Sequence, residues 1–340
     1  MIIAAGVGLA LSFGVYQFKT HKRQGGSVAS RSSPESIKSG RASCRIEDLR
    51  LRLPVGGTAG KEWEIANYFD TNPAVSKIRD YMGSNGQDAV TYDGHAGIDF
   101  ELSSFRPMDR GFPVLASADG VVEETYDHAP DRNRTCVKEK GNHVKLRHSN
   151  GFATIYEHLR RGSVLVHIGD RVAAGTPLGL VGSSGCSSFP HLHLEVQDCQ
   201  ERSLDVMGER LFESPPAYAR SMPATVMETT IFQPSITDMA SVMEPGDTDL
   251  DQVIQGREAS IGVTVANMKA RDMIKIEFLT PNNTLAPFVF EQSLQSFHAR
   301  THWWYNFTFD QSGRWLARIS INGRIQSERP ILATGHMAER

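Results

Sequence analysis

The segment 191–196, HLHLEV, begins with two histidines that lie one residue apart. Alternate side chains of a β-strand point to the same face, so His191, His193 and Glu195 would share one face while three apolar residues face a core. Two charged imidazoles side by side would repel each other, so the pattern indicates either neutral imidazoles or a bound metal ion. An exposed histidine pair without a function is the other interpretation, and the pair alone does not decide.

A second candidate lies upstream in the segment 92–100, YDGHAGIDF, where His95 and Asp99 are four residues apart. Glycines on both sides of His95 favour an irregular turn that leads into a strand. Two imidazole nitrogens and one carboxylate oxygen, from His95, Asp99 and a histidine of the HLH strand, form a donor set that suits zinc. Three protein ligands leave a fourth position for water, as in catalytic zinc sites.

A third candidate is His158, which ends the segment 153–158, ATIYEH, just before a turn. Alternation places its side chain on the same strand face as Thr154 and Tyr156. The following segment 166–185 is a hairpin punctuated by glycines, and it leads directly into the HLH strand. The chain order therefore predicts that His158 and the HLH histidines lie near one another.

Short β-like segments between turn residues dominate the chain. Between residues 45 and 200 these segments are closely spaced and lack helical periodicity, which predicts an antiparallel β-sheet domain. Residues 201–224 are rich in proline and predict a connector. Strands that alternate apolar and polar residues over 225–335 predict an immunoglobulin-like β-sandwich. The expected fold class is mainly β, with an antiparallel sheet domain, a C-terminal β-sandwich and an N-terminal apolar helix.

Residues 2–18 form an uncharged and mostly apolar segment, followed by basic residues. Its length is at the lower end for a membrane span and is also close to a signal-peptide core. No small-x-small cleavage motif follows closely, so we expect residues 1–20 to be an uncleaved anchor helix, with a flexible linker over 21–44. The basic cluster would place the rest of the chain in the cytoplasm by the positive-inside tendency, and this conflicts with the cysteine pattern below.

The bulk composition is that of an ordinary soluble protein, with 40% hydrophobic and 22% charged residues. At 340 residues, two folded domains plus tails are expected. The net charge of −3, without a basic stripe interleaved with aromatic residues, argues against a nucleic-acid partner.

Taken together, these motifs resemble the LytM/lysostaphin-like zinc metallopeptidases of bacterial cell walls. The resemblance covers about residues 53–197 and is carried by an ordered series of motifs: HAGID, GFPVLASADGVVEE, HSNGFATIYEHL, VHIGDRVAAGTPLGLVGSSG and HLH. It implies one Zn²⁺ per chain bound by His95, Asp99 and His193, with His158 and His191 as catalytic histidines. It also implies that residues 45–200 hydrolyse amide bonds in peptidoglycan peptide stems or cross-links.

Two departures from the family pattern stand near the site. Phe189 occupies a position before Pro190 where the family usually has a small residue, so it is predicted to narrow or reshape one wall of the groove. The charged insert 127–141 is longer than a usual hairpin and is predicted to border the cleft. Glu195 is expected to orient a ligand or meet solvent. Ordinary strand or surface roles are expected for the remaining histidines of this region: His128, His143, His148 and His167.

Two functions other than a peptidase are also compatible with the sequence. A non-catalytic LytM-like envelope factor would bind the cell wall and regulate other hydrolases, but such factors typically lack some of the five site residues, all of which are present here. A structural or adhesive envelope protein would use the C-terminal domain instead. Three consecutive aromatic residues, Trp303, Trp304 and Tyr305, cannot all face one core, so at least one is predicted to be exposed. It would contact glycan, peptide or an envelope protein partner, or pack on the peptidase domain.

The chain has four cysteines and no CxxC pair, which is compatible with two disulfides in an exported protein or with four buried thiols. The antiparallel strand order would place Cys136 beside Cys186, near His158 and His191. Cys199 would lie about 20 Å away, beyond the other end of the HLH strand, which leaves Cys44 as its partner. The expected location is the cell envelope, on the periplasmic or extracellular side, with inner-membrane anchoring by residues 2–18.

Overall fold

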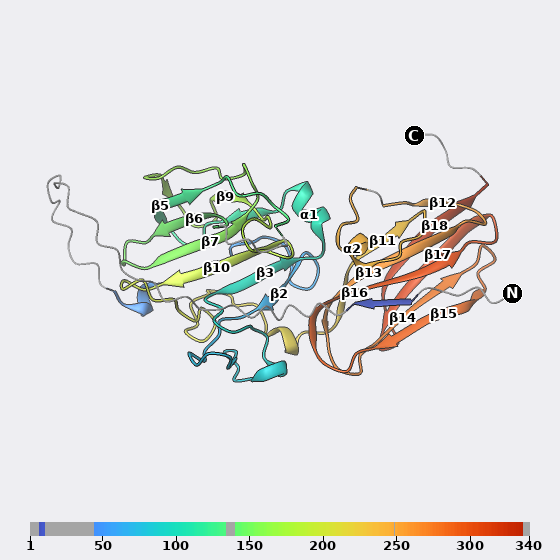
Figure 1. Ribbon diagram of the computed structural model, residues 1–340, viewed down its shortest axis with the longest axis horizontal. Coiled ribbons are helices and arrows are strands. Elements are labelled where there is room, and N and C mark those ends of the chain that lie inside the picture. The colour runs from blue at the N-terminus through green and yellow to red at the C-terminus, as the bar shows by residue number, and fades with distance from the viewer. Residues whose placement is uncertain (1–6, 11–43, 134–139, 248, 336–340) are drawn as a thin grey trace.

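The computed structural model describes residues 7–10, 44–133, 140–247 and 249–335, and strands grouped into several sheets make up most of its regular structure (Figure 1). A seven-stranded sheet lies to one side of the molecule and a pair of sheets to the other. The predicted fold class, mainly β with antiparallel sheets, is therefore confirmed at this level.

The seven-stranded sheet has the order β2-β3-β10-β7-β6-β5-β8, and all its neighbouring strands are antiparallel. A separate two-stranded sheet pairs β4 with β9. The bounds are β2 Trp63–Asn67, β3 Ile98–Leu102, β4 Pro113–Leu115, β5 Gly120–Tyr126, β6 Asn142–Arg147, β7 Ala153–Leu159, β8 Arg171–Val172, β9 Pro177–Leu180 and β10 His191–Gln197.

Strict alternation along β3 and β10 gives the seven-stranded sheet one apolar and one polar face. Leu192 and Leu194 of β10 join Ile98 and Phe100 of β3 in the core, where all four are fully buried. Burial of each such side chain contributes about 1.5–3 kcal/mol to folding. The histidines of β10 and the acidic residues of β3 therefore share the opposite face.

The described helices are short: η1 Ile46–Asp48, η2 Gly86–Asp88, α1 Phe105–Arg110, η3 Ala219–Ser221 and α2 Met239–Met243. The Ser104 side chain caps α1 by accepting a hydrogen bond from the backbone N–H of Arg106. Among the residues that the structure describes, no helix is long and apolar enough to cross a membrane. In Figure 1, α1 and α2 lie between the seven-stranded sheet and the sheets formed by later residues.

Two further sheets, which we call the C-terminal sheet pair, enclose a second hydrophobic core. One has the order β1-β16-β13-β11 and the other β12-β18-β17-β14-β15. The bounds are β1 Val7–Ala10, β11 Thr225–Phe232, β12 Gln252–Ile254, β13 Glu258–Met268, β14 Met273–Leu279, β15 Leu285–Ser293, β16 His298–Thr308, β17 Gly313–Ile321 and β18 Arg324–Thr334.

Only residues 7–10 of the predicted N-terminal helix are described, and they form a strand instead. Residues Val7–Ala10 form β1 and pair antiparallel with β16, Val7 opposite Tyr305 and Ala10 opposite His302. The edge of a sheet presents unpaired N–H and C=O groups, and a short apolar segment can satisfy them by adding a strand. The rest of the predicted anchor 2–18 and the linker up to residue 43 lie outside the described residues.

The prediction of an exposed aromatic residue in β16 is also wrong. Trp303, Trp304 and Tyr305 are 0%, 8% and 6% exposed. Trp303 and Tyr305 belong to the second core, as alternation requires. Trp304 lies opposite Gly262, and a Cβ at Gly262 would be 3.3 Å from the Val242 side chain of α2. The outer face of this sheet is therefore covered as well.

One disulfide joins Cys44 to Cys199, with Cα atoms 6.1 Å apart, as predicted. Cys186 is also in a disulfide. Its predicted partner, Cys136, lies outside the described residues. The Cys44–Cys199 bond links the residue that begins the described range 44–133 to the turn after β10, and so closes a loop that contains all seven strands of the sheet.

Candidate metal centre and catalytic site

Three of the five predicted site residues meet at one point on the polar face of the seven-stranded sheet. His193 of β10 lies directly opposite Asp99 of β3, and His95 sits in the turn just before β3. His193 Nδ1 is 2.8 Å from Asp99 Oδ1, while His95 Nε2 is 3.1 Å from both atoms. All three residues are buried, and together they form a group that could hold a metal ion.

Protein contacts fix the orientation of each of the three side chains. His95 Nδ1 donates to the Tyr68 carbonyl at 2.7 Å, which leaves Nε2 unprotonated and directed at the other two ligand atoms. Asn67 donates from Nδ2 to Asp99 Oδ2 at 2.9 Å, so Oδ1 stays available. A Cβ at Gly97 would lie 2.8 Å from the His193 ring and 2.4 Å from the Leu194 carbonyl. Only glycine permits this close approach.

The charge balance of the group favours a cation. Burial alone would raise the pKa of Asp99, but His95, His191 and a hydrogen bond from His193 hold that pKa well below its usual value. A carboxylate and two imidazoles therefore converge in a buried space where their lone pairs need a shared positive partner. Two nitrogen donors and one oxygen donor are a set that Zn²⁺ prefers.

His158 lies at the end of β7 and faces the group from the next strand. Its backbone φ is +62°, in the left-handed region that a non-glycine residue rarely adopts, and such strain often marks functional positions. Nδ1 donates to the Ser184 carbonyl at 2.7 Å. Burial, reinforced by His191 and His193, lowers the pKa of His158 to about 3. The ring is neutral at physiological pH, with its lone pair on Nε2.

His191 begins β10 and stands beside His158, with ring centroids 4.5 Å apart. Its Nδ1 donates to the Phe189 carbonyl at 2.8 Å, so its lone pair is also on Nε2. That Nε2 is 3.8 Å from Asp99 Oδ1, and the side chain is 16% exposed. Both histidines thus use Nδ1 to donate to a backbone carbonyl and stand beside the ligand group, with Nε2 left for a reacting proton.

Residues near the site differ in part from expectation. The Phe189 ring is 2% exposed, so it does not line the groove; it is packed against Phe105 and against residues of β16. A large apolar ring is more stable when it is buried among other side chains than when it faces solvent in a groove. Glu195 accepts hydrogen bonds from Gln197 and Ser203 and acts on His193 only through its charge, which, despite burial, helps to raise the pKa of that imidazole.

The contacts that orient the five site residues were not predicted. The acceptors at Tyr68, Ser184 and Phe189 are backbone carbonyls, which every residue has, so no residue type could have signalled them. Asn67 carried a weak signal as an amide at the end of β2. Residues 127–133 of the insert pack beside the site: Asp131 accepts from Ser183 N–H, and Ser183 Oγ accepts from Arg132 N–H.

Comparisons with known proteins agree with this geometry. Residues 93–206 match the model of Peptidase family M23. The chain is 37% identical to peptidoglycan DD-endopeptidase ShyA of Vibrio cholerae over 138 residues. This match covers 40% of the chain and 25% of the relative. The chain is also 37% identical over 143 residues to DD-carboxypeptidase/endopeptidase Mpg of Neisseria meningitidis serogroup B, covering 41% of this chain and 28% of the relative.

A solved structure of a zinc-containing peptidase from Vibrio cholerae is similar over 47% of this chain and 39% of its own, with 28% identity and a TM-score of 0.33. The chain spans about a quarter of the length of the curated relatives named above. Residues 93–206 thus match a metallopeptidase family, and within this match His95, Asp99 and His193 form a buried group that could hold a zinc ion.

Proposed function

We propose that this protein is a zinc-dependent endopeptidase that hydrolyses amide bonds in the peptide stems or cross-links of peptidoglycan. One observation carries the proposal: two histidines, each held by a hydrogen bond from Nδ1 to a backbone carbonyl, stand beside the ligand atoms of His95, Asp99 and His193. The substrate class comes from the relatives, whose names specify peptidoglycan DD-endopeptidase and DD-carboxypeptidase/endopeptidase activities.

The chain's own residues supply the proton transfers. When bound, Zn²⁺ activates water and polarises the scissile carbonyl. An Nε2 of His158 or His191 accepts the proton of the attacking water, because each ring uses Nδ1 to donate to a backbone carbonyl and keeps Nε2 for the reaction. The same proton is then available for the leaving amine nitrogen. The Ser184 and Phe189 carbonyls hold the rings in position by accepting from Nδ1, and they stabilise the transient imidazolium.

The proposed division of the chain follows the two hydrophobic cores. One core draws its buried residues from 49–219 and the other from 224–333. The two cores support two domains, a peptidase domain predicted over 45–200 and a second domain predicted over 225–335; buried residues of the predicted connector 201–224 add to the first core. The immunoglobulin-like identity of the second domain stays a prediction, as do the anchor 1–20 and the linker 21–44.

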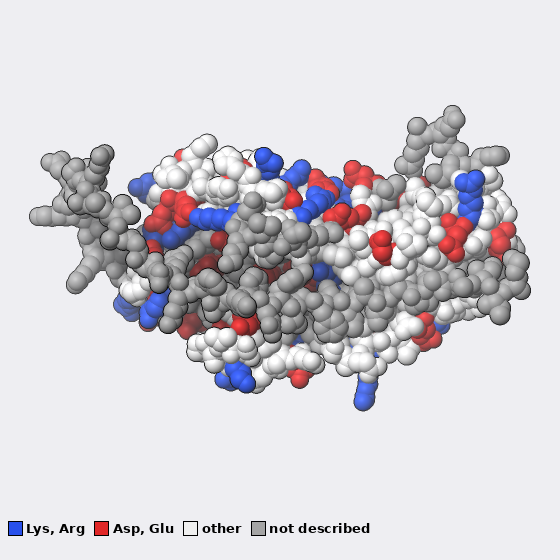
Figure 2. Space-filling model, in the orientation of Figure 1, with Lys and Arg blue, Asp and Glu red and all other residues white. Residues whose placement is uncertain are grey.

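The proposed location is the cell envelope. The Cys44–Cys199 disulfide supports a location in an oxidising compartment. A peptidoglycan substrate also lies outside the cytoplasm, so the enzyme must reach it there. On the face shown in Figure 2, Lys and Arg side chains are interspersed with Asp and Glu side chains among the described residues. That the protein binds no nucleic acid, that it is anchored to the inner membrane and that it has an envelope protein partner remain predictions.

The test uses purified peptidoglycan and the full-length protein, loaded with zinc and with its metal content measured. We expect new free amines to appear with the wild-type protein and not with the Asp99→Ala variant. A wild-type protein that holds zinc and binds peptidoglycan but releases no amines would instead support a non-catalytic envelope factor.

A further inference from the structure

The outer face of β16 packs directly on the polar face of the seven-stranded sheet. Arg300 and His302 lie on this outer face, and both are buried. The Arg300 guanidinium carbon is 3.5 Å from the centroid of the Phe189 ring, and the His302 ring lies 5.6 Å from it. Thr264 of β13 is 3.0 Å from His302 Nδ1 and holds that ring from its own sheet. Two residues of the C-terminal sheet pair thus enclose one residue of the peptidase domain.

A charge contact accompanies the ring contact. Arg300 forms an ion pair with Glu101 of β3 and lies 4.0 Å from a carboxylate oxygen of Glu64 of β2. Glu64, Glu101 and His191 are direct neighbours across three adjacent strands. Burial, followed by repulsion from Glu101, raises the pKa of Glu64 well above its usual value despite Arg300, which favours its neutral form. Arg300 therefore pairs with one charged carboxylate, that of Glu101, which lies directly opposite His191 in the sheet.

Phe189 connects this contact to the reacting groups. Its carbonyl accepts from His191 Nδ1 at 2.8 Å and from Ser187 Oγ at 2.8 Å. Only Pro190 separates the two residues, and the proline ring fixes φ at that position. Any movement of the Phe189 ring is thus transmitted to its carbonyl, and from there to the direction of His191 Nε2. Misplacement of a reacting group by about 1 Å can cost about 10²-fold in rate.

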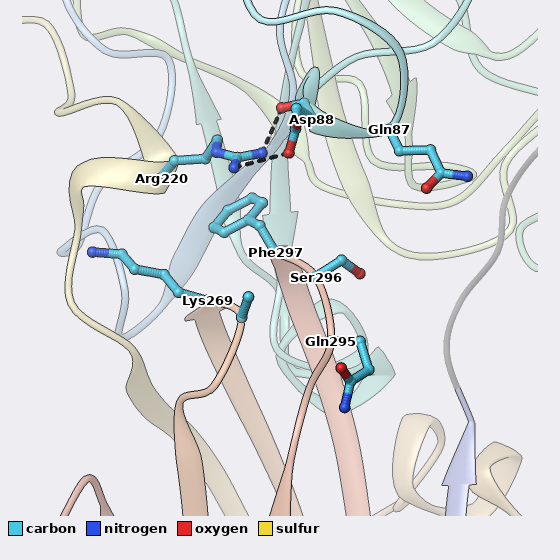
Figure 3. Close-up of a pocket in the computed structure, with 8 residues that line it drawn as sticks. Gln87, Asp88, Arg220, Lys269, Gln295, Ser296 and Phe297 are labelled. Carbon is cyan, nitrogen blue, oxygen red and sulfur yellow. Dashed lines mark hydrogen bonds and ion pairs between the residues drawn. The ribbon is translucent and has the colours of Figure 1, made fainter.

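Other contacts hold the same interface without touching Phe189. Glu228 of β11 accepts from Arg106 Nη1 and from Ser103 Oγ, each at 2.8 Å. At another edge, Arg220 pairs with Asp88 and its guanidinium lies over the Phe297 ring, beside a hollow of ≈ 450 Å³ between the two parts (Figure 3). These contacts provide matched controls, because they join the two parts through side chains other than Phe189.

We propose that Arg300 and His302 of the C-terminal sheet pair are positioning residues for the peptidase reaction, and that they act by fixing Phe189 and through it His191. The inference rests on the proposed function, since it concerns the same site. The C-terminal sheet pair supports the catalytic site beside His191, and its docking controls turnover rather than zinc binding.

The test compares full-length, zinc-loaded variants on a soluble cross-linked muropeptide, with kcat and KM determined separately. The Arg300→Met/Glu101→Gln variant removes both charges together; we expect kcat to fall about 10- to 100-fold with KM and zinc content unchanged. Arg300→Lys retains a cation over the ring and should recover part of the loss. Glu101→Gln alone shows what Glu101 contributes without Arg300. The interface control Glu228→Gln should leave kcat unchanged.

A double-mutant cycle keeps the inference testable if the double charge variant does not fold. Phe189→Leu and Arg300→Met should each lower kcat, and their combination should lower it little further, because both act through the same ring. Independent effects that multiply would overturn the inference. So would a loss of kcat in Glu228→Gln equal to that in Arg300→Met.

A readout without turnover separates this inference from the proposed function. NMR spectra of the histidine ring nitrogens should show His191 protonated on Nδ1 in the wild-type protein, and a mixed state in Arg300→Met. If the wild-type protein cleaves nothing yet shows this change, the proposed function fails and the positioning contact stands. An unchanged His191 spectrum in Arg300→Met would overturn the positioning role, whatever the activity.

Discussion

β10 and β16 have the same pattern and different surroundings. Each strand directs alternate apolar residues into a core and directs polar residues, including histidine, to its other face. In β10 that polar face carries His191 and His193 beside the ligand group. In β16 it carries Arg300 and His302, which are buried against the peptidase domain. What covers the polar face determines whether the same alternation produces a reaction site or an interface.

The largest effect should come from removing a ligand in β3. Asp99→Ala removes the one charged ligand of a three-residue site, so we expect loss of zinc and of all measurable turnover. Elemental analysis beside a muropeptide assay measures both. Glu195→Gln is the control on the same face of β10, since Glu195 bonds Gln197 and Ser203 instead. Zinc retained at wild-type stoichiometry in Asp99→Ala would show that the group is not the metal site.

His158→Ala should separate chemistry from metal binding. His158 is outside the group of three ligand residues, so zinc content should stay at the wild-type level. Turnover should fall about 10²–10⁴-fold, the usual contribution of a general acid–base group. A His158→Ala protein without zinc would mean that His158 holds the metal.

The sequence was sufficient for the locally encoded features. Alternation in HLHLEV predicted the two faces of β10, and the spacing of His95 and Asp99 predicted a shared ion; the structure brings these residues together. The same rule failed for Trp304, because the exposure of its ring depends on α2, which packs on the outer face of this sheet and lies far away in sequence. Phe189 failed for the same reason. Its departure from the family pattern marked the position, but only the docked β16 shows that the ring faces Arg300.

A smaller effect is expected at Gly97, because β3 and β10 can approach closely there only with a residue that has no side chain. Gly97→Ala would place Cβ 2.4 Å from the Leu194 carbonyl, so β3 and β10 must separate. We expect the free energy of unfolding to fall by about 1–3 kcal/mol and zinc to bind more weakly. Gly56→Ala, with nothing within 4 Å of the added atom, is the control. Equal stability of the two variants in urea would contradict this packing.

The smallest effect concerns His148, the residue after β6, whose two ring nitrogens both have hydrogen-bond partners in the protein. Burial, with a contribution from Arg147, lowers its pKa despite a hydrogen bond to the Asp119 carbonyl. The unfolded chain therefore binds a proton below pH about 6.5 that the folded chain does not, and stability falls as pH falls. Between pH 6.5 and 5.5, the wild-type protein in EDTA should lose up to about 1.4 kcal/mol more than His148→Gln. Parallel losses in the two proteins would contradict this assignment.

Mass spectrometry of purified peptidoglycan after incubation with the zinc-loaded, full-length protein tests the central claim most directly. The account predicts that cross-linked muropeptides or their peptide stems are cleaved with the gain of one water per amide bond, and that His158→Ala, with zinc bound, produces almost none of these products. Unchanged muropeptides after incubation with a wild-type protein that contains zinc would contradict it.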